Sequence, residues 1–526
     1  MNSFLQKLRL LSSWSDVHYC VIIYVFSLIL YTLTLRGVYG NPPPNSIKDI
    51  LGQATKPFEL SPERDRFILT YSLAENKSFA LSTLLGEAAF PDDGYSKSGR
   101  IYIFFAPGIS LLALPFYILG HMFQLAQVGA YFSIPLVASG TLVFLFKIAR
   151  NIFKMPTWAA LFAPLVFGFG SSSWNYAITM YQHHVTAFFI ISSFYAVWKF
   201  KQQAKRSWIW GIVVWTNYAL AIGIDYPNAM LLFPVMVYFL ISSIKFTFKL
   251  SSITFSVRKA FLLTMIPFIM LMGLHGYYNQ VNFGSWKTLS GSLADYRAVK
   301  EMHLQTKKNG QKELDNIQNA KQPVSFFREE NVTNGINILL FSDQRGLFFY
   351  SPIFLLAILG ILSQLRKKTV EIGVLLGVIA VNLFVYSSFG DPWGGWAFGP
   401  RYLIPSMSIL SLFVALWLTQ YGKSVYRRLT AFGLFIYSAA IALLGALTTN
   451  ALPPKGEADL LKIPHTYEWN FHFLQNGASS SFLYNTFFAS HISLIGFYLI
   501  LYEILLGLAV VILFILPLKK SYENNA

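Results

Sequence analysis

The sequence predicts an all-α, polytopic membrane protein whose core is a bundle of about 12 transmembrane helices. Hydrophobic residues make up 54% of the chain and charged residues only 12%, whereas a soluble chain carries about 25% charged residues. The mean hydropathy is +0.48. The apolar residues are concentrated in runs of about 15 to 24 residues, the length that a helix needs to cross a bilayer. The short connectors between these runs are mostly basic, as is typical of the cytoplasmic side of a membrane protein.

Charge and cysteine content exclude several other classes of protein. The net charge of +17 would suit a nucleic-acid-binding protein, but the basic residues lie between membrane runs, so we expect no nucleic-acid partner. The single cysteine, Cys20, lies in the first apolar run, which excludes an internal disulfide framework and a cysteine metal site. That run, residues 19–35, lacks a small-x-small cleavage site, so we expect a retained first span and not a signal peptide.

The apolar run at residues 103–120 decides the topology. If this run lies at the outer surface, every short basic connector falls on one side of the membrane, as the positive-inside rule requires. If the run crosses the membrane, the connector that contains Lys147, Arg150 and Lys154 is assigned to the opposite side from the other basic connectors. We therefore expect both termini in the cytoplasm and twelve spans, near residues 19–35, 128–146, 157–170, 185–198, 208–224, 229–244, 260–276, 350–365, 371–389, 402–419, 429–447 and 492–516.

This topology leaves three long outer segments within a single transmembrane domain, residues 1–526. The first should carry a helix near residues 61–80 and a surface helix that ends near Gly120. The cytoplasmic connectors are short and contain no phosphate-binding glycine-rich loop, so we expect no use of cytoplasmic nucleotides. We therefore expect a protein of the inner or plasma membrane whose site faces outside, on the segments 37–127, 277–349 and 448–491.

A glycine- and aromatic-rich loop, Gly390–Tyr402, lies between two of these spans. Its four glycines permit close backbone approach, and Trp393, Trp396 and Phe398 offer flat apolar faces. Arg401 stands where the next span begins, and its planar fork suits a phosphate. An interfacial aromatic belt with a snorkelling arginine is the alternative. We interpret the loop as one wall of a site that also includes Asp391 and Tyr402.

Acidic and basic residues alternate at Glu63, Arg64, Asp65 and Arg66, directly after the expected helix start at Pro62. A carboxylate here would be a general base for an acceptor hydroxyl, with an arginine holding an anionic leaving group. Charge compensation at a helix start is the alternative. Spacing alone does not decide which of the two acids would act.

Two more groups precede apolar runs in the first half of the chain. Lys97 and Arg100, after a pair of aspartates and a glycine, are candidate phosphate contacts, although such a sequence is also typical of a solvated turn. His183 and His184 start a span. Adjacent side chains on a helix point about 100° apart, so we expect one histidine at the rim of a pocket and no metal site.

A carboxylate and a second arginine stand at the outer ends of later spans. Asp225 precedes Tyr226 and a proline, and a carboxylate near membrane depth is a candidate site residue, with turn capping as the alternative. Arg345 enters the span at residues 350–365. Together these residues indicate a cavity that opens toward the outer leaflet.

These features resemble the GT-C glycosyltransferases, a superfamily that includes the protein O-mannosyltransferases and the lipid A aminoarabinose transferase. The first outer loop of such proteins carries Asp-Glu-x-x-aromatic. Here Glu63 keeps the spacing to Phe67, but the Asp-Glu pair is broken. The resemblance covers most of residues 1 to 420. Segments similar to motifs of bacterial members are Tyr95–Lys97, Ala106–Pro115, Arg345–Pro352 and Gly394–Tyr402.

The resemblance implies a transferase that moves a sugar from a polyprenyl-phosphate donor to a hydroxyl acceptor, either glycan, lipid or protein, at the outer leaflet. It implies no metal and no other cofactor, and it makes membrane lipids natural neighbours. The catalytic residue would be Glu63 or Asp65. Trp393, Trp396 and Phe398 would pack the sugar or the first isoprene units. Arg401 would neutralise the leaving phosphate together with Arg64, Arg66, Lys97, Arg100 or Arg345.

Two other functions fit a chain of this kind. An outer-leaflet oligosaccharide polymerase or ligase would share the topology and the class of donor. A transporter or flippase would show related halves and ionisable residues at mid-membrane depth, whereas the charges here gather at the outer rim.

Overall fold

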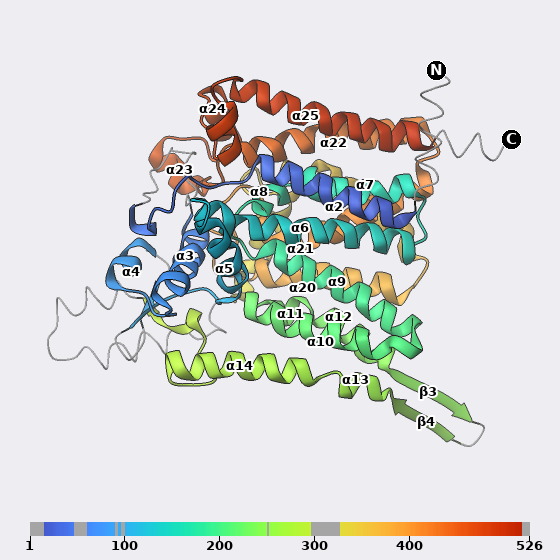
Figure 1. Ribbon diagram of the computed structural model, residues 1–526. Helices are drawn as coiled ribbons and strands as arrows, with labels where there is room; N and C mark the ends of the chain where they lie inside the picture. The colour runs from blue at the N-terminus through green and yellow to red at the C-terminus, as the bar shows by residue number, and fades with distance from the viewer. Residues whose placement is uncertain are drawn as a thin grey trace.

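The fold is known from a computed structural model, which describes residues 15–46, 60–89, 93–95, 100–249, 252–295 and 327–517. These residues form a bundle of long helices that run roughly side by side, with shorter elements gathered at one end (Figure 1). The predicted all-α, polytopic class is confirmed. In the described part of the chain, eight helices are long and apolar enough to cross a membrane, and further apolar helices are shorter.

Each of the twelve predicted spans is helical. Prolines divide three of them, because a proline lacks the N–H that continues a helix: Pro234 and Pro267 lie in the first turn of a new helix, and Pro352 follows a short one. The helices are α2 (Asp16–Leu33), α6 (Ala126–Asn151), α7 (Thr157–Phe169), α9 (His183–Gln202), α10 (Ser207–Ile224), α11 (Asn228–Leu231) with α12 (Phe233–Ser243), α13 (Lys259–Leu263) with α14 (Ile266–Phe283), α18 (Leu347–Tyr350) with α19 (Leu355–Leu365), α20 (Val370–Ser387), α21 (Ile404–Tyr421), α22 (Val425–Leu447) and α25 (Leu494–Val510).

The position of each helix in the bundle follows from how much of it is buried. In the most apolar window of the span that contains α21, 94% of residues are buried, because α21 packs against α7, α9, α19 and α20. In the span formed by α13 and α14, only 11% are buried. The helix α14 therefore lies at the edge of the bundle, as Figure 1 shows, and α21 lies at its centre.

Short elements of the long segments gather at the left end of the bundle in Figure 1. They include α3 (Ser61–Tyr71), α4 (Thr83–Ala89), α5 (Gly108–His121), α23 (Lys455–Leu461) and α24 (Glu468–Gln475). The apolar run at residues 103–120 thus includes most of α5, at this end of the bundle. The helix α5 packs closely on α6, since a Cβ at Gly129 would lie only 2.3 Å from the carbonyl oxygen of Phe116.

A small antiparallel sheet joins the first long segment to the second. Strand β1 (Asp93–Tyr95) lies between β2 (Ile101–Ile103) and β5 (Ala294–Asp295), with Gly94 opposite both Tyr102 and Asp295. A hairpin of β3 (Ile244–Lys249) and β4 (Ser252–Val257) lies at the other end of the bundle, where α2 begins and α25 ends (Figure 1). The sequence analysis expected neither the sheet nor the hairpin.

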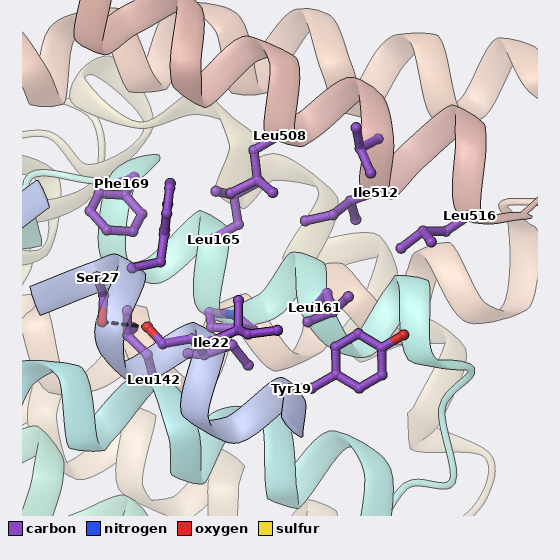
Figure 2. A pocket seen from close by; sticks show the side chains of 14 residues that line it. Tyr19, Ile22, Ser27, Leu142, Leu161, Leu165, Phe169, Leu508, Ile512 and Leu516 are labelled. Carbon is purple, nitrogen blue, oxygen red and sulfur yellow. Dashed lines mark hydrogen bonds between the residues drawn. The ribbon is translucent and has the colours of Figure 1, made fainter. Parts of the chain in front are cut away.

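An apolar pocket of about 180 Å³ lies between α2, α7 and the C-terminal helix (Figure 2). Leu161 and Leu165 line it from α7, and Leu508 and Ile512 line it from the C-terminal end of the chain. No lining side chain is charged, and the hydroxyl of Ser27 donates to the carbonyl oxygen of Ile23, 2.7 Å away. This pocket has no group that would do acid–base or phosphate chemistry.

Candidate functional site

A second, larger cavity of about 380 Å³ lies where α3 and the segment after β2 meet the ends of the bundle helices. Segments that are far apart in the sequence contribute to it: the residues before α9, the α10–α11 junction, the end of α20 and the start of α21. It combines charged, hydroxyl and apolar side chains. Its polar lining consists of Tyr181, Gln182, Asp225, Tyr226, Ser292, Tyr386, Arg401 and Tyr402.

Arg401 is the cation that lines this cavity among the described residues. It opens a short 3-10 turn, Arg401–Leu403, that leads directly into α21. Its Nη1 donates to the hydroxyl of Tyr181 at 3.0 Å, and its guanidinium lies over the rings of Tyr181 and Tyr402, with centroid distances of 5.1 and 5.3 Å. Aromatic faces thus hold the cation without neutralising it, which leaves its charge for an anion.

Arg66 stands behind the cavity wall. It is buried on α3, and its Nη1 donates to the carbonyl oxygens of Pro62 at 3.2 Å and Met180 at 3.3 Å. Its guanidinium lies over the rings of Phe105 and Tyr181, at 4.5 and 5.8 Å from the centroids. Tyr181 therefore contacts both guanidiniums. Burial lowers the pKa of Arg66 to about 10, so at neutral pH it remains a cation and adds positive potential to the cavity.

Asp225 brings a carboxylate to the same cavity. It ends α10 in an extended conformation, and its backbone carbonyl accepts from the N–H of Asn228 at 3.0 Å, which makes the turn into α11. The backbone and not the side chain therefore closes this turn. The side-chain Oδ2 accepts from Nε2 of Gln182 at 3.2 Å. Burial raises the pKa of Asp225 to about 6, and the nearby Arg66 opposes this shift.

Aromatic and aliphatic side chains form the rest of the wall. The rings of Tyr386 and Tyr402 stack with their centroids 4.3 Å apart. The hydroxyl of Tyr226 lies 3.2 Å from Oγ of Ser290. This contact holds the ring of Tyr226 beside the first residue of α11. Met230 is 40% exposed, so the apolar side of the cavity reaches the outer surface of the helices. The lining of the cavity thus includes both polar and apolar side chains, as an amphiphilic ligand requires.

The glycines of the Gly390–Tyr402 loop allow close approach, at Gly394 to residues of the loop itself and at Gly399 to Ser172 and Tyr350. Gly394, Gly395 and Gly399 have φ of 71°, 58° and 64°, a region that side chains with a Cβ rarely adopt. A Cβ at Gly394 would lie 2.9 Å from Nε of Arg401 and 3.1 Å from the ring of Tyr402. The loop therefore wraps tightly against the two residues that line the cavity.

The other aromatic residues of the loop do not line this cavity. Phe398 is fully buried beside Tyr350, and the hydroxyl of Tyr176 bonds both its N–H and its carbonyl oxygen. The indole N–H of Trp396 donates to a carboxylate oxygen of Glu457. Trp393 and Asp391 line a separate, open depression near α23, and the Asp391 carboxylate accepts from the N–H of Gly395. Of the loop's aromatic residues, Tyr402 therefore lines this cavity, whereas Trp393, Trp396 and Phe398 do not.

Arg345 is a structural residue of this loop. It is fully buried and does not line the cavity. Its guanidinium donates to four carbonyl oxygens: Trp393 at 3.0 Å, Gly395 at 3.0 Å, Leu452 at 2.8 Å and Gln344 at 2.8 Å. These contacts tie the loop to the segment before α23. The predicted phosphate contact does not fit this position.

The two acids of α3 are buried away from the cavity. Glu63 and Asp65 have no exposed surface and neither lines the cavity. Oε1 of Glu63 lies 3.8 Å from Nη1 of Arg36, which follows α2 and is also fully buried. Glu63 therefore takes part in a buried ion pair, and of these three carboxylates the one that lines the cavity is that of Asp225.

The remaining predicted basic residues lie outside the cavity or outside the described residues. Arg64 is partly exposed on α3, and Arg100 is exposed just before β2; neither lines the cavity. Lys97 lies outside the residues that the structure describes.

His183 and His184 point to different surroundings, as expected for neighbours on a helix. The ring of His183 stacks on that of Tyr181 with centroids 5.9 Å apart, so it supports the cavity wall from behind. Nε2 of His184 lies 2.7 Å from the carbonyl oxygen of Ser173, in the interior of the bundle. Among the described residues, no group of three or more His, Cys, Asp or Glu side chains is arranged to hold a metal ion.

The sequence analysis did not assign Tyr181, Gln182 and Tyr386 to the site. Each stands at the end of a span, two residues or fewer from an element boundary: Tyr181 and Gln182 directly before α9, and Tyr386 at the last turn of α20. For these three residues the sequence offered one signal, which is the presence of an aromatic or amide residue at the outer end of a span. Because several spans end in such residues, that signal does not select these three.

No family profile and no curated protein matches the sequence. Solved structures with a similar arrangement include ArnT from Cupriavidus metallidurans bound to undecaprenyl phosphate, with 10% identity and a TM-score of 0.48, covering 94% of this chain and 78% of that one. They also include the oligosaccharyltransferase AglB from Archaeoglobus fulgidus in complex with an inhibitory peptide and a dolichol-phosphate, with 13% identity and a TM-score of 0.43. That alignment covers 85% of this chain but only 58% of AglB.

Proposed function

We propose that this protein is a glycosyltransferase that moves a hexosyl or pentosyl group from a polyprenyl-phosphate donor to a hydroxyl acceptor. The observation that carries the proposal is the cavity in which Arg401 and Asp225 face the same space. A cation for the leaving phosphate and a carboxylate near the acceptor are the two groups that such a transfer needs.

The donor phosphate would bind at the Arg401 end of the cavity. A guanidinium offers a planar pair of N–H donors that matches a phosphate, and Arg401 is held in place by Tyr181 and Tyr402. Arg66, behind Tyr181, would add to the positive potential. As the bond to the sugar breaks, negative charge grows on the phosphate, so this cluster stabilises the transition state more than the ground state.

The prenyl chain would leave through the apolar side of the cavity. Val385 and Phe389 line that side from α20 and the residues after it, and Met230 lines it from α11 at the exposed surface. A donor that arrives from the bilayer needs such a lateral path, whereas a water-soluble nucleotide sugar does not.

The proposed orientation follows the basic connectors. The connectors after α12, α19 and α21 carry Lys and Arg, and the positive-inside rule assigns them to the cytoplasm. The cavity would then face the non-cytoplasmic side, together with the three long segments, and both termini would be cytoplasmic.

A turnover assay tests the function. Purified protein in lipid nanodiscs receives a panel of polyprenyl-phosphate sugars with a mixture of hydroxyl acceptors, and the released carrier lipid is quantified. We expect free polyprenyl phosphate with at least one donor, and release about 100- to 1,000-fold slower with the Arg401→Ala variant. Release of polyprenyl diphosphate from a diphosphate donor would instead assign the protein to the polymerases or ligases. Movement of an intact donor across the bilayer without cleavage would make it a flippase.

A further inference from the structure

We infer that Asp225, and not an acid of α3, is the base that deprotonates the acceptor hydroxyl, an inference that rests on the proposed function. Among the described residues, Asp225 is the carboxylate that lines the cavity. The two acids that the sequence favoured, Glu63 and Asp65, have no exposed surface, and Glu63 lies beside the buried Arg36. An acceptor that enters the cavity would meet Asp225 first.

The surroundings of Asp225 leave it able to accept a proton. Gln182 donates to Oδ2 at 3.2 Å and orients the carboxylate. Within the described residues, Asp225 forms no ion pair closer than 4 Å, and it is partly exposed. A neutral amide donor fixes the position of a carboxylate without consuming its charge, whereas a tight salt bridge would weaken it as a base.

The charged and titratable groups around Asp225 come from several elements. Arg66 of α3 attracts its negative charge. Its own negative charge acts on Tyr226, on Tyr386 of α20 and on Tyr402 before α21. These phenols remain neutral at pH 7, so among these groups Arg66 is the one whose charge acts on the Asp225 carboxylate at that pH. Because burial raises the pKa of Asp225 to about 6, it is ionised at pH 7 yet more basic than a solvated aspartate.

The groups described above account for every bond and proton in the proposed sugar transfer. The acceptor oxygen forms a bond to the anomeric carbon of the sugar, and its proton passes to the carboxylate of Asp225. The bond between the anomeric carbon and the phosphate oxygen breaks, and the polyprenyl phosphate leaves with the electron pair, next to Arg401. Asp225 returns its proton to water before the next turnover.

The test compares Asp225→Asn with Glu63→Gln and Asp65→Asn, using Asp343→Asn as a control. Asp343 pairs with His465 on the outer surface, away from the cavity. Two quantities are measured for each protein: release of polyprenyl phosphate from the donor found in the turnover assay, and equilibrium binding of polyprenyl phosphate. Asp225→Asn keeps the size of the side chain and an oxygen for Gln182, so the cavity should keep its shape.

We expect Asp225→Asn to slow turnover by about 100-fold or more while phosphate-lipid binding stays within about 3-fold of wild type. The wild-type kcat/KM should fall tenfold per pH unit below about 6, and Asp225→Glu should restore part of the rate. A greater loss in Glu63→Gln or Asp65→Asn than in Asp225→Asn would return the base to α3 and overturn the inference. Equal losses of turnover and binding in Asp225→Asn would make Asp225 a binding residue. If wild-type protein binds the lipid but releases none from any donor, the proposed function fails, and the inference fails with it.

Discussion

Arg345 contacts the loop of residues 390–402 and Arg401 belongs to it, and the surroundings of the two arginines differ in kind. Arg345 donates to four backbone carbonyl oxygens and has no exposed surface. Arg401 donates to the phenol of Tyr181, lies over the rings of Tyr181 and Tyr402, and lines a cavity. Carbonyl oxygens use up the donors of the first arginine, whereas aromatic faces hold the second and leave its charge for a ligand. The same residue type is thus a support in one position and a binding group in the other.

The largest expected effect is that of Arg401→Ala on turnover. Removing the cation should slow release of polyprenyl phosphate by about 100- to 1,000-fold, because a charge-stabilising donor is lost where negative charge grows. The melting temperature in detergent should stay close to that of wild type. Arg401→Lys should recover only part of the rate, since an ammonium lacks the planar fork. A variant that keeps full turnover would remove Arg401 from the site.

Arg345→Ala should have the opposite signature. It leaves four carbonyl oxygens without their donor, and one unsatisfied buried group costs about 1–3 kcal/mol. We expect a clear fall in melting temperature and in yield of folded protein. Binding of polyprenyl phosphate per folded molecule should fall less than in Arg401→Ala. A stable variant that no longer binds the lipid would show that Arg345 is itself a phosphate ligand.

Tyr181→Phe tests how Arg401 is held. The change removes the hydroxyl that accepts from Nη1 of Arg401 at 3.0 Å but keeps the ring beneath both guanidiniums. A hydrogen bond to a charged group contributes about 1.5 kcal/mol or more, so turnover should fall by about 10-fold or more. Tyr181→Leu should cost more, because it also removes the aromatic face. Equal effects of the two changes would mean that the hydroxyl alone positions Arg401.

Trp396→Phe should have the smallest effect. Its indole N–H donates to Glu457 at the outer side of the loop, outside the cavity. We expect a small loss of stability, measured as a shift in melting temperature, and turnover within about twofold of wild type. A tenfold loss of turnover would place the sugar or the acceptor against this tryptophan, as the sequence suggested.

The helices were predictable from the sequence because membrane spans are encoded locally. Each span appears as an apolar run. The basic connectors predict that residues 103–120 lie outside the spans, and α5 lies among the short elements at one end of the bundle. The β3–β4 hairpin was missed because its strands lie between two apolar runs, where the basic residues indicated only a short connector. Prediction of the sheet of β1, β2 and β5 was not possible from local pattern, since it pairs segments about 200 residues apart.

The site was predictable only in part. Arg401, Tyr402, Asp225 and Tyr226 do line one cavity, and all four stand where a span ends or begins. The sequence does not reveal which way a loop side chain turns. Phe398 is buried because Tyr176 holds its backbone, and that contact joins residues 222 positions apart. Glu63 meets Arg36 for a similar reason, through packing of α3 near the end of α2.

The most direct test of this account is a binding titration of a short-chain polyprenyl phosphate against purified protein in nanodiscs, with inorganic phosphate as competitor. We expect saturable binding to wild-type protein, at least tenfold weaker binding to Arg401→Ala, and little competition from inorganic phosphate because the apolar side of the cavity holds the chain. Equal affinity of wild type and Arg401→Ala would contradict the assignment of this cavity as the donor site.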